Sequence, residues 1–338
     1  MRAVVLVGGF GTRLRPLTLN SPKQMLPVVG VTMFERVIAA LGRHGVDEAI
    51  ISLGYRPDRF IEAWPSGVCA GVRLHYAAEP EPLDTAGAIR FAAESAGVDE
   101  TFIVVNGDVL TDLDYAWLVE RHHEFGAEAT LHLVPVDEPS RFGVVPTDES
   151  GRVLEFVEKP AAGTEPTNYI NAGTYVMEPS VLARIEPGRK VSVEREVFPA
   201  MAAAGTLFAV GTDDYWLDAG TPEALVTANL DLVDGHRSVI ETAVSPTAKL
   251  EDGCVVEHSV VGSRVCISSG ARIVDSVVMD DVTIGADAVI ERSIVASGAT
   301  IGAGAIVTNQ SVVGFDATVG DGVRLDAATE PPASSWLT

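Results

Sequence analysis

The chain has few of the features that would define its class at once. Its three cysteines, Cys69, Cys254 and Cys266, are odd in number and lack the close C-x-x-C spacing of a zinc site. We therefore expect free thiols in a reducing compartment, the cytoplasm. Glycine, proline or charge interrupts each apolar run well before the roughly 18 residues that a membrane-spanning helix needs, so we expect no membrane segment and no leader.

Positive charge is also scarce. The chain has 24 Lys and Arg residues against 47 Asp and Glu residues, which gives a formal net charge of -23. This balance argues against a nucleic-acid-binding protein, because such proteins concentrate positive charge against phosphates. The first acidic residue, however, is Glu35, and the segment before it holds Arg2, Arg13, Arg15 and Lys23. A cationic segment in an acidic protein predicts a small, highly anionic ligand that is bound locally.

The first two thirds of the chain have the pattern of an α/β domain. A length of 338 residues suggests two domains. Up to about residue 235, short β-rich runs alternate with helical patterns, which predicts a Rossmann-like, mixed and mostly parallel sheet covered by helices. The predicted strands are 3–7, 49–53, 73–76, 102–106, 130–134 and 174–176, and the predicted helices include 34–44, 86–95, 114–125 and 222–233.

The pattern changes after Gly235. Apolar residues now recur about every six positions, at Ile267, Ile273, Met279, Ile284, Ile290, Val295, Ile301, Val307, Val313 and Val319. A period of six predicts three short strands per triangular coil and a left-handed parallel β-helix of about four coils, whereas a β-sandwich would show a period of two. We assign residues 1–235 to the α/β domain, 236–250 to a linker, 251–325 to the β-helix and 326–338 to a C-terminal tail.

A glycine-rich turn follows the first predicted strand. It is the stretch GGFGTRLRPLT, residues 8–18, and SPK follows it, ending at Lys23. Glycines after a strand allow backbone N–H groups to approach phosphate oxygens at the edge where open α/β sheets bind ligands. Two common motifs are absent, because Leu14 replaces the third glycine of G-x-G-x-x-G and no P-loop is present. The guanidinium of Arg13 and the ammonium of Lys23 suit a triphosphate and its leaving pyrophosphate.

A second candidate segment is Asn106-Gly107-Asp108, which ends the strand predicted at 102–106. We expect Asp108 to reach the same sheet edge as the glycine turn, where a carboxylate beside phosphates indicates a Mg²⁺ ligand; a turn-forming Asp is the alternative. If the group that attacks the triphosphate is itself a phosphate, its oxygen is anionic at neutral pH, so the reaction needs positioning and charge neutralisation but no protein nucleophile. We assign no catalytic Ser, Cys or His, and we interpret His122-His123 as a solvated helix face.

Seven motifs, in order, resemble those of the nucleoside-diphosphate-sugar pyrophosphorylases, most of all the mannose-1-phosphate guanylyltransferases. They are GGFGTRLRPLT with SPK, PLDTAGA at 82–88, NGD at 106–108, FVEKP at 156–160, INAGTYV at 170–176, SVEREVFP at 192–199 and YWLDAGTPE at 215–223. With the hexad repeat, they cover nearly the whole chain. The resemblance implies that a nucleotidyl group is transferred from an NTP to a sugar 1-phosphate, with Mg²⁺ as cofactor and pyrophosphate as product.

The resemblance also implies roles for individual residues. Asp218 would join Asp108 as the second metal ligand, and Arg13, Lys23 and Asp108 form the predicted catalytic set. The predicted nucleotide contacts are Leu6, Gly8, Gly9, Gly11, Thr12, Gln24, Glu79, Asp84, Thr85 and Gly87. The predicted sugar-phosphate contacts are Gly107, Glu158, Lys159, Asn171 and Gly173.

The loop EPEPLDTAGA, residues 79–88, should lie against the base. Guanine presents N1–H and N2–H₂ side by side to a carboxylate, whereas thymine and uracil suit an amide. The loop holds acidic residues but no Gln or Asn, which favours GTP. Thymidylyl, adenylyl and uridylyl transfer stay open, because Asp84 stands where the family's PLGTAG has glycine and Lys23-Gln24 resembles glucose-1-phosphate thymidylyltransferases. The acceptor is predicted to be mannose 1-phosphate or a sugar-like cyclitol phosphate.

Two other classes of function make different demands on the sequence. A noncatalytic subunit that senses NDP-sugars would not need all five charged residues of the predicted site, Arg13, Lys23, Asp108, Lys159 and Asp218. An acyltransferase β-helix usually has more coils and a basic histidine, and this one offers only His258. We expect the β-helix to form a homo-oligomer through its open coil edges and apolar faces, and we expect no nucleic-acid or membrane partner.

Overall fold

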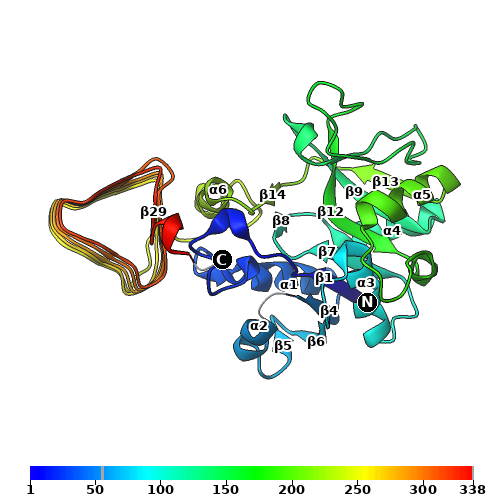
Figure 1. Ribbon diagram of the computed structural model, residues 1–338, viewed down its shortest axis with the longest axis horizontal. Helices are drawn as coiled ribbons and strands as arrows, with labels where there is room; N and C mark the ends of the chain where they lie inside the picture. Colours follow the sequence, from blue (N-terminus) through cyan, green and yellow to red (C-terminus); the bar gives the residue numbers. More distant parts are fainter. Residues whose placement is uncertain (55–56, 337–338) are drawn as a thin grey trace. The chain divides into compact units, whose positions relative to one another are not determined.

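The computed structural model describes residues 1–54 and 57–336 (Figure 1). The chain forms two compact units that do not follow its order. The first unit consists of Met1–Gly9 and Phe34–Trp216, and the second of Phe10–Met33 and the chain from Leu217 onward. The segment Phe10–Met33, which we call the cationic loop, thus groups with the C-terminal part. The chain passes from one unit to the other inside the glycine turn and again two residues before Asp218.

The first unit is built on a mixed ten-stranded sheet. Its order is β11-β10-β12-β7-β1-β4-β6-β5, and β9 joins β12 to β13. Strands β6, β4, β1 and β7 are parallel, whereas β12 is antiparallel to β7. The bounds are β1 Arg2–Leu6, β4 Glu48–Leu53, β5 Val68–Cys69, β6 Val72–Ala78, β7 Phe102–Asn106, β9 Ala129–Pro135, β10 Gly143–Val144, β11 Val157–Glu158, β12 Tyr169–Met177 and β13 Leu207–Gly211.

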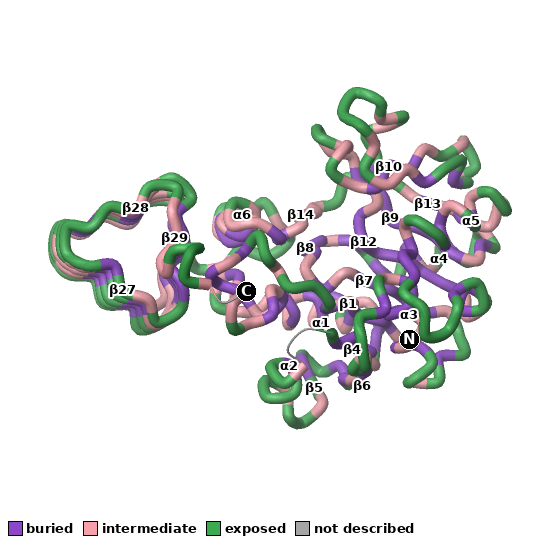
Figure 2. The backbone as a smooth tube through the Cα atoms, viewed as in Figure 1, coloured by how far each residue is buried: buried purple, intermediate pink, exposed green. Residues whose placement is uncertain are grey.

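The central strands are buried on both faces, so their side chains form continuous apolar runs rather than an alternating pattern (Figure 2). Helix α3 packs against β1 and β4, and α4 packs against β9, β12 and β13. The helices of this unit are α1 Met33–Arg43, α2 Pro57–Ala63, α3 Asp84–Ser95, α4 Tyr115–Phe125 and α5 Phe198–Ala204, with a π-helical turn at Val193–Val197 and a short strand β8 at Val109–Thr111. The structure confirms the α/β class and the strands and helices predicted from periodicity.

One prediction for this unit is wrong. His122 does not belong to a solvated face: its side chain is buried, with Nδ1 2.8 Å from Thr130 Oγ1 and Nε2 3.1 Å from Glu178 Oε1. Burial lowers the pKa of His122 and favours its neutral form. The neighbouring His123 is exposed. The pattern of apolar and polar residues in α4 could not show which of the two histidines is buried, because the partners of His122 come from β9 and from the residue after β12.

The second unit contains the left-handed β-helix class of fold that the hexads predict. Fifteen short strands form three parallel sheets of five. The first sheet holds β15 Lys249–Leu250, β18 Cys266–Ile267, β21 Thr283–Ile284, β24 Thr300–Ile301 and β27 Thr318–Val319; the second β16 Val255–Glu257, β19 Arg272–Val274, β22 Val289–Glu291, β25 Ile306–Thr308 and β28 Arg324–Asp326; the third β17 Val260–Val261, β20 Val277–Val278, β23 Ile294–Val295, β26 Val312–Val313 and β29 Thr329–Glu330.

The hexad count needs two corrections. There are five coils rather than four, because the first and last coils carry charged residues such as Lys249 and Glu330 in their strands. The interior position assigned to Met279 belongs to Val278, which packs in the core of the β-helix. The reason is the coil length: Val260 pairs with Val277 and Val277 with Ile294, so these coils advance by 17 residues and one of their three sides is a residue short.

The cationic loop packs on the other parts of the second unit. It contains the 3-10 turns η1 Thr12–Leu14 and η2 Lys23–Met25 and the hairpin β2 Pro27–Val28 and β3 Val31–Thr32. Val29 N donates to Asn229 Oδ1 at 2.7 Å, on helix α6 Pro222–Asp234. A β-carbon built on Gly314 would lie 3.2 Å from Cγ of Pro16, so the loop also meets the β-helix directly.

Across residues 1–54 and 57–336, no helix combines the length and the apolar character that crossing a membrane requires.

Candidate active site

The glycine turn and the NGD segment leave the same edge of the sheet. Leu6, the last residue of β1, is in register with Asn106, the last residue of β7, and Gly107 N donates to Leu6 O at 2.9 Å. Two adjacent parallel strands therefore deliver Gly8 and Asp108 to one edge, as predicted. This is the edge at which open α/β sheets bind ligands.

Strand β12 approaches this edge closely through a glycine. Gly173 lies at φ +76°, at a register shift between Asn171 and Tyr175, and a β-carbon on it would be 2.5 Å from Asn106 Nδ2. Asn171 is held at both ends, because its Nδ2 donates to Tyr175 Oη at 3.0 Å and its Oδ1 accepts from Gly173 N at 3.1 Å. Burial raises the pKa of Tyr175 above its usual range, so this hydroxyl stays protonated.

Glu79 is a fixed carboxylate just after β6. Its Oε1 accepts from Ser52 Oγ at 2.8 Å, and its Oε2 accepts from Leu83 N at 3.0 Å. Each carboxylate oxygen can accept more than one hydrogen bond, so a ligand donor can still bind here. Asp84 lies at φ +60° and its Oδ1 accepts from Thr85 N at 2.8 Å. The residue that replaces the family's glycine thus keeps the left-handed backbone that glycine favours.

Thr85 and Gly87, both predicted nucleotide contacts, also hold the SVEREVFP segment in place. Thr85 Oγ1 accepts from Val193 N at 2.8 Å and donates to Glu194 Oε2 at 2.7 Å. A β-carbon on Gly87 would lie 3.0 Å from Arg189 O. The motif resemblance implied no role for Glu194. Only the order of the motifs hinted that the two segments belong together.

Glu158 and Lys159 lie at the end of edge strand β11. Glu158 is half-buried, and its Oε2 lies 3.0 Å from the position of a β-carbon on Gly143. Lys159 lies at φ +50°, donates its backbone N–H to Phe142 O, and places Nζ 3.6 Å from Glu158 Oε1. Because Lys159 is exposed, its ammonium can move from this carboxylate to an anionic ligand.

In the second unit, Arg13 and Asp218 converge on one glycine. A β-carbon on Gly220 would lie 2.7 Å from Arg13 Nη2 and 2.8 Å from Asp218 Oδ1. Gly220 N also donates to Asp218 Oδ1 at 3.0 Å, which fixes the carboxylate two residues before it. Arg13 and Asp218 are 205 positions apart in the chain. They can approach each other here because position 220 has no side chain.

The turn at Gly11 brings Lys23 back toward the start of the cationic loop. Gly11 lies at φ +57°, and a β-carbon on it would be 3.0 Å from Thr18 Cγ2 and 3.2 Å from Lys23 Cβ. Thr12 is exposed. Gln24 is fully buried, and neither its amide nitrogen nor its amide oxygen has a hydrogen-bond partner among the described residues.

The predicted site residues divide between the two units. The first unit holds Leu6, Gly8, Gly9, Glu79, Asp84, Thr85, Gly87, Gly107, Asp108, Glu158, Lys159, Asn171 and Gly173, and the second holds Gly11, Thr12, Arg13, Lys23, Gln24 and Asp218. Within the described part of the chain, no three His, Cys, Asp or Glu side chains are grouped to hold a metal ion.

Comparison with known proteins gives the family. Residues 2–235 match the family described as "Nucleotidyl transferase", and residues 239–334 match the "GMPPB C-terminal domain". The chain belongs to the nucleotidyl transferase family. It is 44% identical over 269 residues to "Mannose-1-phosphate guanylyltransferase" of Mycobacterium tuberculosis, which covers 75% of this chain and 74% of that protein.

Two further relatives extend this finding. The chain is 37% identical to "Probable mannose-1-phosphate guanylyltransferase 2" of Oryza sativa subsp. japonica, over 98% of this chain and 96% of that protein. The crystal structure of HddC from Yersinia pseudotuberculosis complexed with GMP-PN is similar with a TM-score of 0.58 and 31% identity, over 68% of this chain and 97% of that one. Both the α/β part and the β-helix therefore have relatives among nucleotidyltransferases.

Proposed function

We propose that this protein transfers GMP from GTP to mannose 1-phosphate or a closely similar sugar or cyclitol phosphate, giving a GDP-sugar and pyrophosphate. The observation that carries the proposal is the arrangement of Arg13 and Asp218 around Gly220. A guanidinium binds phosphate oxygens, and a carboxylate beside it suits a metal that is itself bound to phosphates. The names of the relatives support the choice of reaction.

The chain's own residues supply positioning and charge. Arg13 and Lys23 would neutralise the triphosphate and stabilise the leaving pyrophosphate, while the backbone at Gly8 and Gly9 would approach its oxygens. Lys159 would bind the phosphate of the acceptor, and Glu158 and Asn171 would accept hydrogen bonds from its hydroxyl groups. The acceptor oxygen is already anionic, so aligning it with the α-phosphorus removes much of the barrier without a protein nucleophile.

We propose that Asp108 of the first unit and Asp218 of the second each offer a carboxylate to Mg²⁺. In proteins, Mg²⁺ is usually held by one or two carboxylates together with substrate phosphates, which is the kind of ligand set that these two side chains and a bound triphosphate would provide. When bound, Mg²⁺ would neutralise phosphate charge and orient the attacking and leaving oxygens. Asp218 is already oriented by the backbone N–H of Gly220.

Two features support guanine as the base. Glu79 is a carboxylate fixed by Ser52 and Leu83, and guanine can donate two parallel hydrogen bonds to such a group. Gln24, whose amide resembles that of the thymidylyltransferases, is fully buried. The group that would favour thymine is therefore turned into the protein, while the group that would favour guanine is held at the end of β6.

The test is pyrophosphate release with GTP, dTTP, UTP and ATP, each combined with mannose 1-phosphate or glucose 1-phosphate. We expect GTP with mannose 1-phosphate to be the best pair, a loss of at least 100-fold in Asp218→Asn, and a specific loss with GTP in Glu79→Gln. The exposed Glu81→Gln is the matched control and should keep its rate. Absence of turnover with every pair would reject the enzymatic function and favour the NDP-sugar-sensing subunit.

We also propose that the protein is a homo-oligomer assembled through the β-helix. Leu250, in a strand of the first coil, is 44% exposed and Val323, just before the last strands, is 43% exposed, so both ends of the coil stack offer apolar side chains. Uncapped coil ends are natural pairing surfaces. Light scattering should give a mass at least twice 35.6 kDa, and a monomer at all accessible concentrations would reject the proposal.

A further inference from the structure

One corner of the β-helix is irregular. Most coils advance by 17 residues, but Ile294 pairs with Val312, an advance of 18, before the next coil returns to 17. The additional residue lies at the corner after β25, where Asn309 and Gln310 are both left-handed, at φ +57° and +63°. The corresponding corners of the preceding coils have one such residue each, Arg292 and Asp275. Backbone strain of this kind costs free energy and tends to persist where it serves a function.

The extra residue also interrupts a ladder of buried serines. Ser276 N donates to Ser259 Oγ, and Ser293 N donates to Ser276 Oγ, both at 3.1 Å. The next rung would join Ser311 N to Ser293 Oγ, but Ser311 N instead donates to Thr308 O at 3.2 Å. The ladder then resumes with Ala328 N donating to Ser311 Oγ at 3.1 Å. The break therefore occurs at one rung only, between Ser293 and Ser311.

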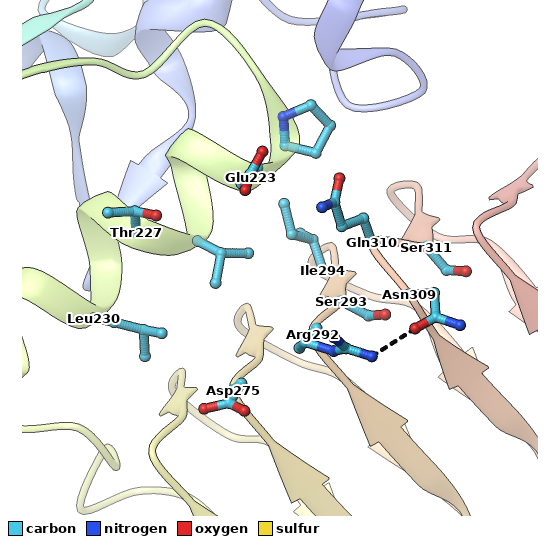
Figure 3. A pocket seen from close by; sticks show the side chains of 12 residues that line it. Glu223, Thr227, Leu230, Asp275, Arg292, Ser293, Ile294, Asn309, Gln310 and Ser311 are labelled. Atoms are coloured by element: carbon cyan, nitrogen blue, oxygen red, sulfur yellow. Dashed lines mark hydrogen bonds between the residues drawn. The ribbon is translucent and has the colours of Figure 1, made fainter. Parts of the chain in front are cut away.

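A cavity opens at that rung, between the β-helix and helix α6. It has a volume of about 340 Å³ and lies entirely within the second unit (Figure 3). Ser293 and Ser311 line it together with Gln310 and Arg292. The volume is at the lower end of the range for small-molecule sites and is sufficient for a nucleoside-sized ligand. The cavity, the two left-handed corner residues and the interruption in the serine hydrogen bonds therefore occur at the same corner of the β-helix.

The lining of the cavity changes in character along its length. Figure 3 shows Glu223 and Gln310 toward one end and Arg292 and Asp275 toward the other, with Ile294 among them. Helix α6 adds Val226, Thr227 and Leu230. The aliphatic side chains offer a surface for a flat ring, and the exposed carboxylate of Glu223 and the amide of Gln310 can bond to the polar edge of that ring.

The end that holds Arg292 suits an anion. Arg292 Nη2 donates to Asn309 Oδ1 at 2.6 Å, and its Nε lies 3.6 Å from Glu291 Oε1. Because the Arg292 side chain is 58% exposed and a guanidinium carries five N–H groups, it can also donate to a ligand. The charge of Asp275 is offset, because its Oδ1 lies 2.5 Å from Nδ1 of His258, whose other ring nitrogen lies 2.8 Å from Asp234 Oδ2. Arg292 is the only cationic side chain among the described residues that line the cavity.

We propose that this cavity binds a nucleoside monophosphate, with the base against Val226, Leu230 and Ile294, its polar edge at Glu223 and Gln310, and the phosphate at Arg292. The site goes beyond the proposed transferase function and uses none of its catalytic residues. It is coupled to them through α6, because Pro222 and Glu223 line the cavity and Asp218 lies four residues before that helix. Thr221 caps the helix by accepting from Ala224 N at 3.2 Å, so the first turn of α6 is tied to the segment that follows Asp218.

The experiment counts binding sites for GMP and AMP on the full-length protein by calorimetry. The Arg13→Ala background removes a residue of the predicted catalytic site, so we expect one remaining site there. Adding Arg292→Gln should weaken that site at least tenfold, and adding Thr227→Trp should abolish it by filling the cavity. Arg264→Gln is the matched control, because Arg264 is also a left-handed corner residue, bound to Asp281, but does not line the cavity.

Hydrogen exchange shows where the nucleotide binds. It also distinguishes a variant that has lost the site from one that has failed to fold. GMP or AMP should slow amide exchange in 222–230 and 306–312 of the Arg13→Ala protein, and Arg292→Gln should remove this protection while leaving exchange of the β-sheet core unchanged. No site for either nucleotide in the Arg13→Ala protein, or a site there that Arg292→Gln and Thr227→Trp leave unaffected, would overturn the proposal. If only the transferase function were wrong, GTP would not be turned over, but calorimetry would still detect nucleotide binding at this cavity.

Discussion

The two units place their polar side chains in opposite ways. The sheet unit buries several of them in uncharged form, as with Tyr175 and His132, both in its interior strands. The β-helix keeps them at exposed corners as ion pairs, such as Arg264 with Asp281 at 2.6 Å. Burial disfavours charge, so the sheet gains rigid neutral networks, whereas the corners gain charged ladders that remain hydrated. In both units the candidate sites lie where the regular pattern stops, at strand ends or at the one longer coil.

The largest expected effect is a loss of stability of the sheet unit in acid, caused by protonation of His132. Its Nε2 lies 2.7 Å from Thr212 Oγ1, its Nδ1 has no partner among the described residues, and burial lowers its pKa to about 4. The unfolded chain binds this proton near pH 6.5, so acidification between these values favours unfolding, by about 3 kcal/mol in total. Urea unfolding of the sheet unit should show this loss, and His132→Gln should flatten it.

The exposed His123→Gln is the control for this prediction and should retain the wild-type dependence. A His132→Gln protein that loses stability with falling pH as steeply as the wild type would show that other groups cause the acid sensitivity.

The second effect concerns the tight packing of charged groups in the second unit. Gly220→Ala would place a β-carbon 2.7 Å from Arg13 Nη2 and 2.8 Å from Asp218 Oδ1, so one of these groups must move. Displacement of a catalytic group by a fraction of an ångström to 1 Å can cost about 100-fold in rate, and we expect a loss of that order in kcat/KM. The melting temperature should change little, because Asp218 is half-buried and can shift.

Gly320→Ala is the matched control, since the nearest atom to its added carbon is Val323 Cγ2 at 3.6 Å and its φ is ordinary. Full activity in Gly220→Ala would contradict the proposed roles of both Arg13 and Asp218.

A third, smaller effect would show whether the β-helix positions the cationic loop. In Gly314→Val, the added side chain would meet Pro16 Cγ and Glu330 O, both 3.2 Å from its β-carbon. Pro16 lies three residues after Arg13, so we expect about a tenfold rise in KM for GTP with a smaller change in kcat. Gly320→Val should have neither effect. An unchanged KM in Gly314→Val would show that the loop does not depend on this contact.

The smallest effect concerns the corner histidine. Hydrogen bonds with Asp275 and then Asp234 raise the pKa of His258, so its contribution to stability is present in acid and is lost as pH rises through that value. The side chain is 47% exposed, and we expect less than about 1 kcal/mol. Calorimetric melting of the second unit, with His258→Gln beside His236→Gln, should detect a difference at pH 6 that disappears by pH 9. Its sign is opposite to that of His132.

Local sequence patterns predicted the helices and strands, but they could not predict which distant segments of the chain contact one another. The spacing of apolar residues predicted the parallel strands and the coils, because regular elements bury side chains at fixed intervals along the sequence. The same rule misplaced Met279, since a regular count cannot detect a side that is one residue short. No local signal indicated that Gly220 separates Arg13 from Asp218, or that Thr85 binds Glu194, because these contacts join segments far apart in the chain.

The grouping of the cationic loop with the C-terminal unit has a consequence for synthesis on the ribosome. Phe10–Met33 is translated well before helix α6 and the coils on which it packs. At about 5–20 residues per second, roughly 10–60 s pass between the two events. Throughout that interval the basic, apolar segment of the nascent chain lacks the surfaces on which it packs in the folded protein.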